Sequence, residues 1–539
     1  MRKAAPTLAT TFVTIFAGLA LACGAQPAGD DTGDPEPTTG TTGDAPLWAD
    51  EHCSLANPSP YPPTGTYMSN HAGRENTNAI PCAGPRAFEF AWHVLPTHAS
   101  GQPNTFSPDG SVAYFTATTG DDDCNVFAVD TDDGALLWKR CDLPFTVLAS
   151  TVDVDENGDL YLTAGDSVHA LSPADGRDRW TTALPDTSDV GFSYGLKFTA
   201  DGHIVTQVAD GTVYLLERAT GKILTSLSVA EVTGFVPAEA TELPIYMAPD
   251  YILERLHTLV GDAHFNEAIE ALSGLLGASG GFADNTVCTT ARRQVLTVGG
   301  GPNLDTGAAV ALDIVGPAEA PALQLRWALT LPAGTASSVV ASTDGARAVL
   351  GDGNGHVHMI DVPACDKNLD DDADPLRCAP AWIFRHPGGR LLGTVALDAE
   401  GVVYVFTSGP ERVEEIYALS DHGDSYTLAW QQDYGPLAMM TSVLTVTDDA
   451  IYGVLSQVDP AAELDALTLP ASITSEVVVI DKKSGEIVHR AATPESSLTE
   501  LVLSPRGDLF LTALGVYEIL TLDEAAPAPV GGLRKFTGR

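Results

Sequence analysis

The chain has 539 residues and is strongly acidic, with 71 Asp and Glu against 28 Lys and Arg and a formal net charge of −43. Such a charge repels nucleic acid and anionic lipid, so neither is expected as a main partner. No run of 18 apolar residues follows the N-terminal region, so no later segment is expected to cross a bilayer.

The N-terminus has the features of an export signal. Arg2 and Lys3 precede an uncharged stretch of apolar and small residues that ends in Leu-Ala-Leu-Ala before Cys23. These features are typical of a secretory signal peptide, here residues 1–22. The ending resembles a bacterial lipobox, which implies lipidation of Cys23, and Gly24 after it implies sorting to the outer membrane, at its periplasmic face or at the cell surface. An ordinary signal peptide with a chance cysteine is the alternative.

Two segments separate the signal from the main domain. Residues 23–46 contain mostly Gly, Pro, Thr and acidic side chains, without Leu, Ile, Val or an aromatic residue. Such a composition cannot bury apolar surface, so a disordered acidic tether is expected behind the lipidated cysteine. Residues 47–86 form a Pro-rich N-terminal extension.

An internal repeat runs through most of the remaining sequence. Each copy has an alternating apolar strand, a polar turn that ends in Gly, and a second strand, as in residues 125–138, 167–180, 212–225 and 476–489. A second hairpin with an Asp-Gly, Asn-Gly or similar turn lies upstream of each, and such turns are strong hairpin signals because Gly adopts positive φ without steric cost. Four short antiparallel strands in roughly 42–59 residues predict one blade of a β-propeller.

The tryptophans indicate how many blades there are. One position in the predicted fourth strand holds Trp in five copies, and Thr225 and His489 hold it in two more. Trp92 lies in a similar strand isolated at the N-terminus. The sequence therefore predicts an all-β fold with eight blades, and seven to nine blades are compatible with it. The predicted blade-docking residues are Trp92, Trp138, Trp180, Trp327, Trp382 and Trp430.

The two ends of the repeat region are expected to meet. The last copy, residues 500–522, shows three strands and lacks a fourth, which residues 87–95 would supply, so that no sheet edge stays exposed. The propeller is predicted over 87–525, and residues 526–539 are expected to form a C-terminal tail. Within it, apolar residues at helical spacing predict a helical insert at about 247–278, as a cap over one face or as a partner-docking element.

The pattern Ala-Leu/Val-Asp-x-x-x-Gly-x-x-x-Trp, best seen in residues 125–138 and 167–180, resembles the tryptophan-docking repeat of the pyrroloquinoline-quinone (PQQ) propellers. The resemblance covers nearly all of residues 87–522 and implies that each Trp packs between neighbouring blades. The family includes quinoprotein dehydrogenases and non-catalytic lipoproteins, among them a lipidated eight-bladed propeller of the outer-membrane-protein assembly machine. The repeat is specific for a fold and carries little information about function.

The sequence shows no catalytic motif. Quinoprotein alcohol dehydrogenases typically have a disulfide between adjacent cysteines, a calcium site and an Asp base in the central funnel, whereas this chain has no Cys-Cys pair and no motif that matches the other roles. It also lacks Gly-x-Ser-x-Gly, His-Glu-x-x-His and P-loop patterns. No catalytic residue and no PQQ are therefore expected.

Two groups of residues are candidate metal ligands. In the first, four oxygen-bearing side chains alternate in one acidic loop, and crowded hard oxygen ligands suit Ca²⁺, although a solvated loop explains them equally. They are Asp366, Asn368, Asp370 and Asp372. In the second, His356 and His358 alternate along a strand and share a face. His358 occupies the repeat position held by His169, Phe127, Tyr214 and Tyr417, which favours a ring packed inside the blade.

The cysteines predict three disulfides, since exported proteins meet oxidising conditions. Cys124 and Cys141 lie at equal distances from a hairpin turn and would face each other across it. Two further pairs would close the acidic loop and staple the N-terminal extension, and Cys288 would remain a buried free thiol. These pairs are Cys365 with Cys378, and Cys53 with Cys82.

The sequence thus favours a lipid-anchored, monomeric binding or scaffold protein. Its working surfaces would be a propeller face, the helical insert or exposed strand edges, and its partners envelope or extracellular proteins, with the membrane contacted only through the lipid. A PQQ- and Ca²⁺-dependent oxidoreductase of alcohols or sugars is the first alternative. A propeller hydrolase or lyase with a funnel site is the second.

Overall fold

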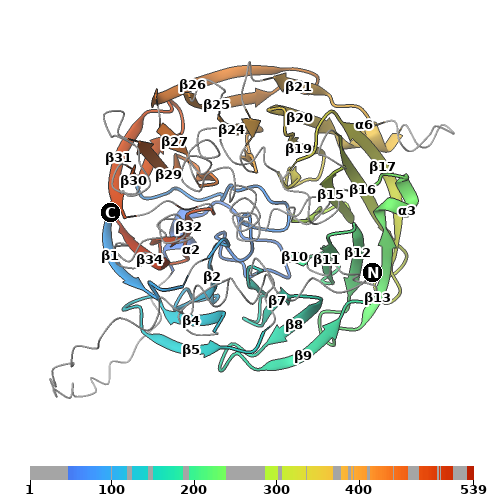
Figure 1. Cartoon of the computed structure of the whole chain (residues 1–539), viewed down its shortest axis with the longest axis horizontal. Coiled ribbons are helices and arrows are strands. Elements are labelled where there is room, and N and C mark those ends of the chain that lie inside the picture. Colours follow the sequence, from blue (N-terminus) through green and yellow to red (C-terminus); the bar gives the residue numbers. More distant parts are fainter. Residues whose placement is uncertain are drawn as a thin grey trace, which may run out of the picture.

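The computed structural model describes most of the chain after the tether. It describes residues 47–539 except 99, 118–123, 144–149, 186–192, 238–285, 302–305, 336, 368–377, 386–389, 392–393, 409–412, 437, 441, 459–472, 495–496, 498 and 514–530. The described strands form eight antiparallel sheets arranged around one axis (Figure 1), which confirms the predicted eight-bladed β-propeller. No described helix is both long and apolar enough to span a membrane.

Blades 1 to 4 follow the chain in simple order from the inner to the outer strand. Blade 1 contains β2 (Thr105–Phe106), β3 (Val112–Thr116), β4 (Val126–Asp130) and β5 (Leu136–Arg140). Blade 2 contains β6 (Asp153–Val154), β7 (Leu160–Ala164), β8 (Ser167–Leu171) and β9 (Asp178–Ala183). Blade 3 contains β10 (Ser193–Phe198), β11 (Ile204–Val208), β12 (Thr212–Leu216) and β13 (Ile223–Ser228). Blade 4 contains β14 (Cys288–Thr289), β15 (Gln294–Gly300), β16 (Gly307–Val315) and β17 (Ala322–Leu331).

Blades 5 to 7 repeat this order, with the innermost strand of blades 6 and 7 split in two. Blade 5 contains β18 (Val340–Ala341), β19 (Arg347–Gly351), β20 (His356–Asp361) and β21 (Trp382–Arg385). Blade 6 contains β22 (Arg390–Leu391), β23 (Ala396–Leu397), β24 (Val402–Ser408), β25 (Val413–Asp421) and β26 (Tyr426–Pro436). Blade 7 contains β27 (Ala438–Met440), β28 (Thr445–Val446), β29 (Ala450–Val458), β30 (Ile473–Asp481) and β31 (Ile487–Thr493). Three short helices lie outside the sheets: α2 (Trp48–His52), α3 (Val229–Thr233) and α6 (Val362–Lys367).

Blade 8 closes the ring with both ends of the chain, and here the predicted boundaries were wrong. It contains β32 (Val502–Leu503), β33 (Leu509–Ala513), β34 (Gly532–Gly538) and, as its outer strand, β1 (Phe88–Val94). The predicted C-terminal tail therefore holds the third strand of the last blade, and β1 pairs with β34, not with residues 500–522. β34 pairs with β33 on one side and β1 on the other, and its Leu533 and Phe536 are fully buried. Its sequence has no adjacent hairpin partner, so no local signal marks it as a strand. The predicted helical insert at 247–278 lies outside the described residues.

Burial differs between middle and outer strands because the blades stack face to face. Middle strands such as β7, β11 and β33 are buried at every position, since a neighbouring blade covers each of their faces. Outer strands such as β5 and β9 are half exposed and alternate. The pattern of apolar residues in each repeat thus distinguishes the middle strands of a blade from its outer strand.

The predicted tryptophans dock each blade onto the next. Trp138, Trp180 and Trp430 lie over the turn glycine of the following blade, and each indole N–H donates to the carbonyl three residues before that glycine, at 2.8, 3.2 and 2.9 Å. Trp92 packs in the same way on Gly134, where β1 of blade 8 meets blade 1. Trp382 instead donates to the Asp421 carboxylate of blade 6 at 2.7 Å, and Trp327 is fully buried against residues of blade 5.

Each docking turn requires glycine, which gives a matched test. Gly221 has a φ of 72°, and a Cβ there would lie 2.4 Å from Cε3 of Trp180. Gly202 has a φ of 81° with nothing within 4 Å of its would-be Cβ, so it reports backbone strain alone. We expect Gly221→Ala to lower the free energy of unfolding by about 1–3 kcal/mol more than Gly202→Ala, the usual cost of overpacking. Equal losses in urea denaturation would contradict the docking role.

Candidate functional site

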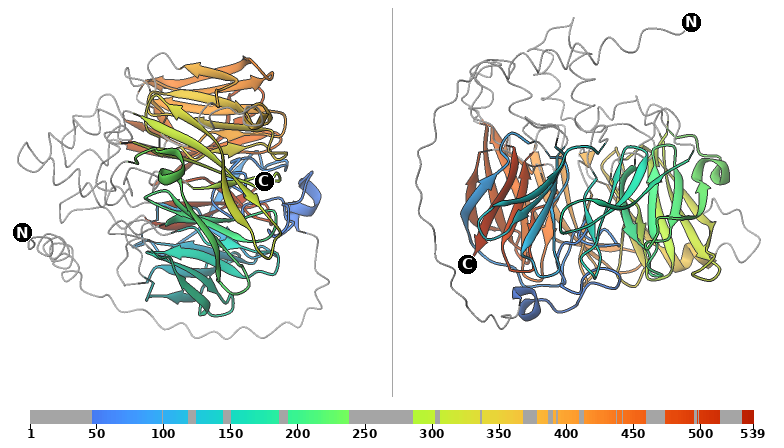
Figure 2. Two further views of the ribbon diagram at one scale, coloured as in Figure 1. Left: turned by 90° about the vertical axis from the view of Figure 1, so that its right-hand side faces the viewer. Right: turned by 90° about the horizontal axis from the view of Figure 1, so that it is seen from below.

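The N-terminal extension passes through the centre of the propeller. Residues 58–82, here named the axial segment, follow α2 and run across the middle of the ring (Figure 1), and α2 itself lies on one face of the disc (Figure 2). Most side chains between residues 60 and 80 are buried. The extension that the sequence places before the propeller is thus part of its core.

Backbone hydrogen bonds fix the axial segment to the inner strands of successive blades. Carbonyl groups of the segment accept from the amides of blades 2, 4, 5, 6 and 7, at 2.8 to 3.1 Å. The donors are Val154, Thr289, Ala341, Leu397 and Val446, and the acceptors are Met68, Arg74, Glu75, Thr77 and Asn78. The segment turns around the axis through positive φ values at four non-glycine residues, His71, Ala72, Asn76 and Asn78. The inner strands of five of the eight blades therefore form backbone hydrogen bonds with the axial segment.

A disulfide fastens the axial segment close to its two ends. Cys53 pairs with Cys82 and joins residues 29 positions apart, so the segment forms a closed loop. Trp48 of α2 packs on Gly507, in the β32–β33 turn of blade 8. This disulfide and α2 hold the segment at one face of the disc.

Six buried ionisable residues, here named the axial cluster, surround the segment. The segment contributes three of them and the inner strands or loops of blades 2, 3 and 8 the others, and each has at most 7% of its surface exposed. They are His71, Arg74, Glu75, Asp153, Lys197 and Glu500.

Lys197 is the centre of the axial cluster and is fully buried. Its Nζ donates to Ser69 Oγ at 2.7 Å, to the Gly73 carbonyl at 2.8 Å and to the Asn70 carbonyl. Burial lowers the pKa of Lys197 to about 8, against the opposing effect of nearby Asp153. Burial likewise raises the pKa of Asp153 to about 7, although Lys197 counteracts it.

The other acids of the axial cluster have cationic partners as well. Glu75 Oε1 accepts from Arg74 Nε at 2.7 Å, and burial raises the pKa of Glu75 in spite of that contact. Glu500 forms an ion pair with His71; burial acts against its charge, but the neighbouring His71 outweighs burial and lowers the pKa of Glu500. Each acidic residue of the axial cluster therefore interacts with a cationic residue of the same chain.

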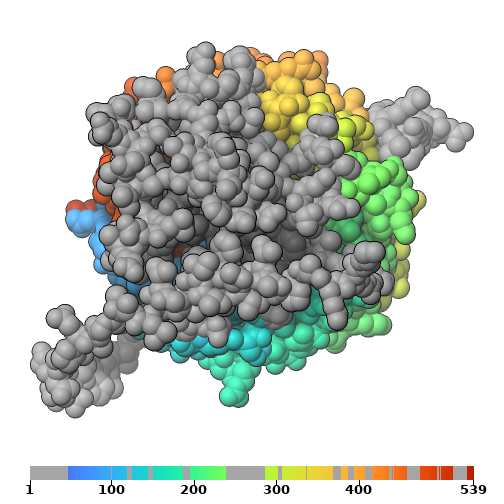
Figure 3. Space-filling model, in the orientation of Figure 1, coloured from blue at the N-terminus to red at the C-terminus, as the bar shows by residue number. Residues whose placement is uncertain are grey.

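The described structure presents apolar side chains at the outer edge of the ring. Five exposed residues lie on the outer strands of four consecutive blades, 6, 7, 8 and 1, and are named here the rim patch: Leu428, Val488, Phe90, Leu136 and Leu137. These outer strands run along the circumference (Figure 1), part of which is visible at the edge of the space-filling view (Figure 3). Leu137 and Val488 occupy the bulge beside the Trp position, which turns them outward.

The predicted cysteine pairs are present. Cys124 is bonded to Cys141 and Cys365 to Cys378, and Cys288 is a buried free thiol. Burial raises the pKa of the Cys288 thiol above its usual range.

Only one of the four calcium candidates lies in the described structure. Asp366 is buried at the end of α6, where its carboxylate faces Arg292 Nη2 at 3.3 Å and Arg326 Nε at 3.2 Å. Asn368, Asp370 and Asp372 lie outside the described residues, so a calcium site in this loop stays a prediction. The carboxylate of Asp366 is already neutralised by two arginines.

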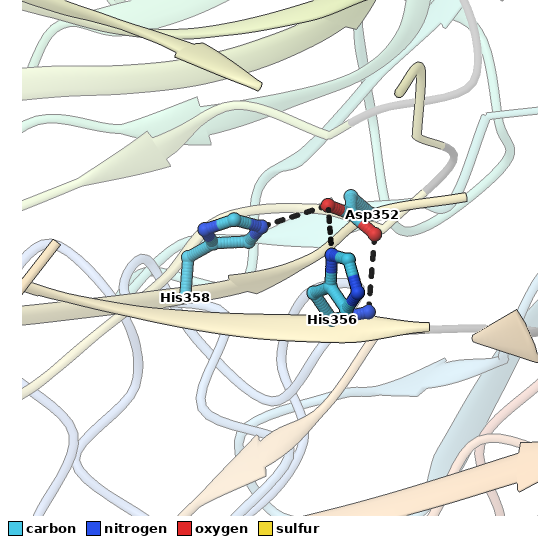
Figure 4. Close-up of side chains that lie close together, drawn as sticks. All are labelled: Asp352, His356 and His358. Atoms are coloured by element: carbon cyan, nitrogen blue, oxygen red, sulfur yellow. Dashed lines mark hydrogen bonds and ion pairs between the residues drawn. The ribbon is translucent and has the colours of Figure 1, made fainter. Parts of the chain in front are cut away.

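The two predicted histidines lie together with a carboxylate. His358 is buried in β20, in the same strand position as His169 in β8, Phe127 in β4 and Tyr214 in β12. Asp352, in the β19–β20 turn, lies against both His356 and His358 (Figure 4). His358 therefore packs inside the blade, as the sequence favours, and also belongs to a polar cluster with Asp352 and His356.

Sequence reasoning missed the axial segment and its cluster. One signal was present: Lys197 interrupts an apolar strand at a position that is buried in every other blade. The paired residues lie far apart in the sequence, however, and no local pattern connects Lys197 with Asn70 or Asp153.

Comparisons with known proteins agree with the repeat pattern over part of the chain. Residues 122–240 match the family model described as outer membrane protein assembly factor BamB. A curated protein of that name from Salmonella typhimurium is 36% identical over 121 residues, which are 22% of this chain and 28% of the relative. The match therefore spans less than a third of the length of that relative.

Solved structures extend the likeness to the whole ring. The quinohemoprotein alcohol dehydrogenase of Comamonas testosteroni superposes with a TM-score of 0.53 at 12% identity, over 88% of this chain and 80% of that chain. The related enzyme ADHIIG of Pseudomonas putida HK5 gives a TM-score of 0.51 at 13% identity, over the same shares of the two chains. At such identities the likeness concerns the fold alone. The protein is thus an eight-bladed β-propeller in which residues 122–240 match the family model of outer membrane protein assembly factor BamB.

Proposed function

We propose that this protein is a lipid-anchored scaffold of the cell envelope that binds proteins concerned with outer-membrane assembly. One observation carries the proposal: the chain fills its own axis, where a propeller enzyme would hold a substrate, and exposes apolar side chains at its circumference. The partial match to an assembly factor supports the same class of partner.

The rim patch has the character of a protein-docking surface. Exposed apolar side chains of a folded domain can mark interaction sites, and these five lie on the outer strands of four consecutive blades. Among the described residues, the outer edges of these strands are not paired with another strand, so a partner strand can add there. The net charge of −43 favours a partner with a neutral or basic docking segment.

The axis does not fit the cofactor of the enzymatic alternative. The family resemblance implies a funnel with Ca²⁺ and an Asp base for the quinoprotein dehydrogenases. In the described part of the chain, Asp153, Glu75 and Glu500 each face a cation of the protein, and the axial segment occupies the space between the inner strands. A divalent ion and a quinone would have to displace these contacts.

The anchor follows from the N-terminal sequence. We propose that residues 1–22 are removed, that Cys23 is lipidated at the outer membrane, and that residues 24–46 act as the tether. The described domain begins just before α2, so the proposed tether joins the propeller on the α2 face.

A site-specific photo-crosslinker at Leu137 tests the docking role in intact envelopes. We expect adducts with a protein of the outer-membrane assembly machinery. Arg179 occupies the same bulge position in β9 of blade 2, outside the rim patch, and serves as the matched control. Equal adducts at the two positions, or none at either, would contradict a rim docking site.

Addition of PQQ and Ca²⁺ to the purified protein tests the enzymatic alternative. We expect neither tight binding nor dye-linked oxidation of alcohols or sugars. Saturable PQQ binding together with turnover would replace the scaffold proposal by an oxidoreductase.

A further inference from the structure

Three ligand atoms converge at the turn between β19 and β20 in blade 5. Asp352, His356 and His358 each offer one atom of a kind that binds metal ions, and these atoms all lie within 4.8 Å of one another. Asp352 Oδ2 is 2.8 Å from His358 Nε2 and 3.3 Å from His356 Nδ1 (Figure 4). Two ligands that bind one Zn²⁺ tetrahedrally at about 2.0–2.1 Å lie roughly 3.3 Å apart, which matches the His356–Asp352 separation. The 2.8 Å between Asp352 and His358 is that of a direct hydrogen bond, so a bound ion would have to move these two atoms apart by about 0.5 Å.

The carboxylate is held in place by the turn itself. Asp352 Oδ1 accepts from the backbone amides of Asn354 at 2.9 Å and His356 at 3.0 Å. These bonds occupy Oδ1 and leave Oδ2 directed at the two imidazoles, and the Asp352 side chain is completely buried. Such support of a ligand by neighbouring groups is typical of metal sites.

Part of this arrangement is a structural device of the propeller. In blade 2, Asp155 accepts from two backbone amides through Oδ1 and from the Tyr161 hydroxyl through Oδ2. In blade 6, Asp398 and Tyr404 repeat the pattern. The Asp352–His358 contact alone would therefore need no metal.

The recurring contact between a turn Asp and a ring six residues later does not explain His356. The corresponding position of the third strand, two residues before the aromatic position, holds Asn125, Ser167 and Thr212 in blades 1 to 3. Blade 5 places a second imidazole there, with its Nδ1 aimed at the same carboxylate oxygen that His358 approaches. His358 Nδ1 is buried without a hydrogen-bond partner, so this ring makes its polar contact only on the Asp352 side.

We propose that Asp352, His356 and His358 bind one Zn²⁺ ion through Oδ2, Nδ1 and Nε2. Two imidazoles and one carboxylate are borderline ligands that suit Zn²⁺ better than Ca²⁺ or Mg²⁺. His358 and Asp352 are buried, whereas 23% of the His356 side chain is exposed, so the fourth position faces solvent and is available to water or to a ligand atom of a partner.

Competition with a chromogenic zinc indicator tests the site on the purified protein after removal of metal by a chelator. We expect about one equivalent of Zn²⁺ and a loss of affinity of at least about tenfold in His356→Ala, because one ligand is gone. Co²⁺ should give the visible spectrum of a four-coordinate ion in the wild type and not in this variant. His203→Ala removes an exposed histidine elsewhere, which contacts the Ala318 carbonyl, and should bind as the wild type does.

A thermal readout separates loss of the site from loss of the fold. His356 is partly exposed, so His356→Ala should melt like the wild type without metal, and Zn²⁺ should raise the Tm of the wild type alone. Equal zinc affinity in His356→Ala and the wild type, or no stoichiometric binding in the wild type, would overturn the proposal. The scaffold function does not depend on this outcome, because the rim crosslinks are measured separately.

Discussion

Replacement of Lys197 by Met is expected to lower the free energy of unfolding by about 3–5 kcal/mol, the usual cost of leaving buried polar and charged groups without a compensating cation. Met keeps the apolar part of the side chain, so the loss comes from the missing ammonium group. The carbonyls of Asn70 and Gly73 lose their donor, and Asp153 remains buried without the nearby positive charge that lowers its pKa.

A double variant shows whether charge is the cause. Lys197→Met combined with Asp153→Asn removes both charges, so it should be more stable than Lys197→Met alone, by an interaction energy within about 0.5–3 kcal/mol. Chemical denaturation near pH 8 gives the free energy of unfolding of the wild type, the single variant and the double variant. A loss below about 1 kcal/mol in the single variant, the size of an ordinary surface effect, would show that the axial segment does not pack around Lys197.

Deletion of residues 532–539 is expected to abolish cooperative folding. These residues form β34, which lies between β33 and β1, and without it blade 8 loses its third strand and β1 loses its hydrogen-bonded neighbour. The ring would then be open between blades 7 and 1, with Phe510 and Leu511 uncovered. A loss of this size exceeds the stability of about 5–15 kcal/mol that folded domains have.

The control for this deletion is removal of Arg539 alone. Arg539 lies beyond β34, and its side chain forms an exposed ion pair with Glu89, a contact worth about 0–1 kcal/mol. We expect that variant to unfold in the same transition as the full chain in circular dichroism. A cooperative transition in the longer deletion would contradict closure of the ring by the C-terminus.

The features that the sequence predicted correctly are those that depend on contacts within a single hairpin and recur from blade to blade. Gly134, Gly176, Gly221 and Gly485 share positive φ values of 68° to 78°, so the same turn chemistry recurs at fixed spacing and is readable from one copy. The same holds for Cys124 and Cys141, which follow from the geometry of a single hairpin.

The parts that were missed depend on contacts between distant residues. β34 was predicted as tail because residues 514–530 separate it from β33, and a strand without an adjacent partner gives no hairpin signal. The axial segment has neither strand nor helix periodicity, since its conformation is imposed by hydrogen bonds to five different blades. The Asp352–His356–His358 cluster was half seen: the histidines alternate in sequence, but the carboxylate that joins them belongs to a turn.

The central claim is that residues 58–82 fill the axis of the propeller, and amide hydrogen exchange tests it most directly. The account predicts that the amides of the inner strands that donate to the axial segment exchange as slowly as those of the middle strands, because opening them requires global unfolding. They are those of Val154, Thr289, Ala341, Leu397 and Val446. Exchange of these five amides as fast as in exposed turns would show an open channel and contradict the account.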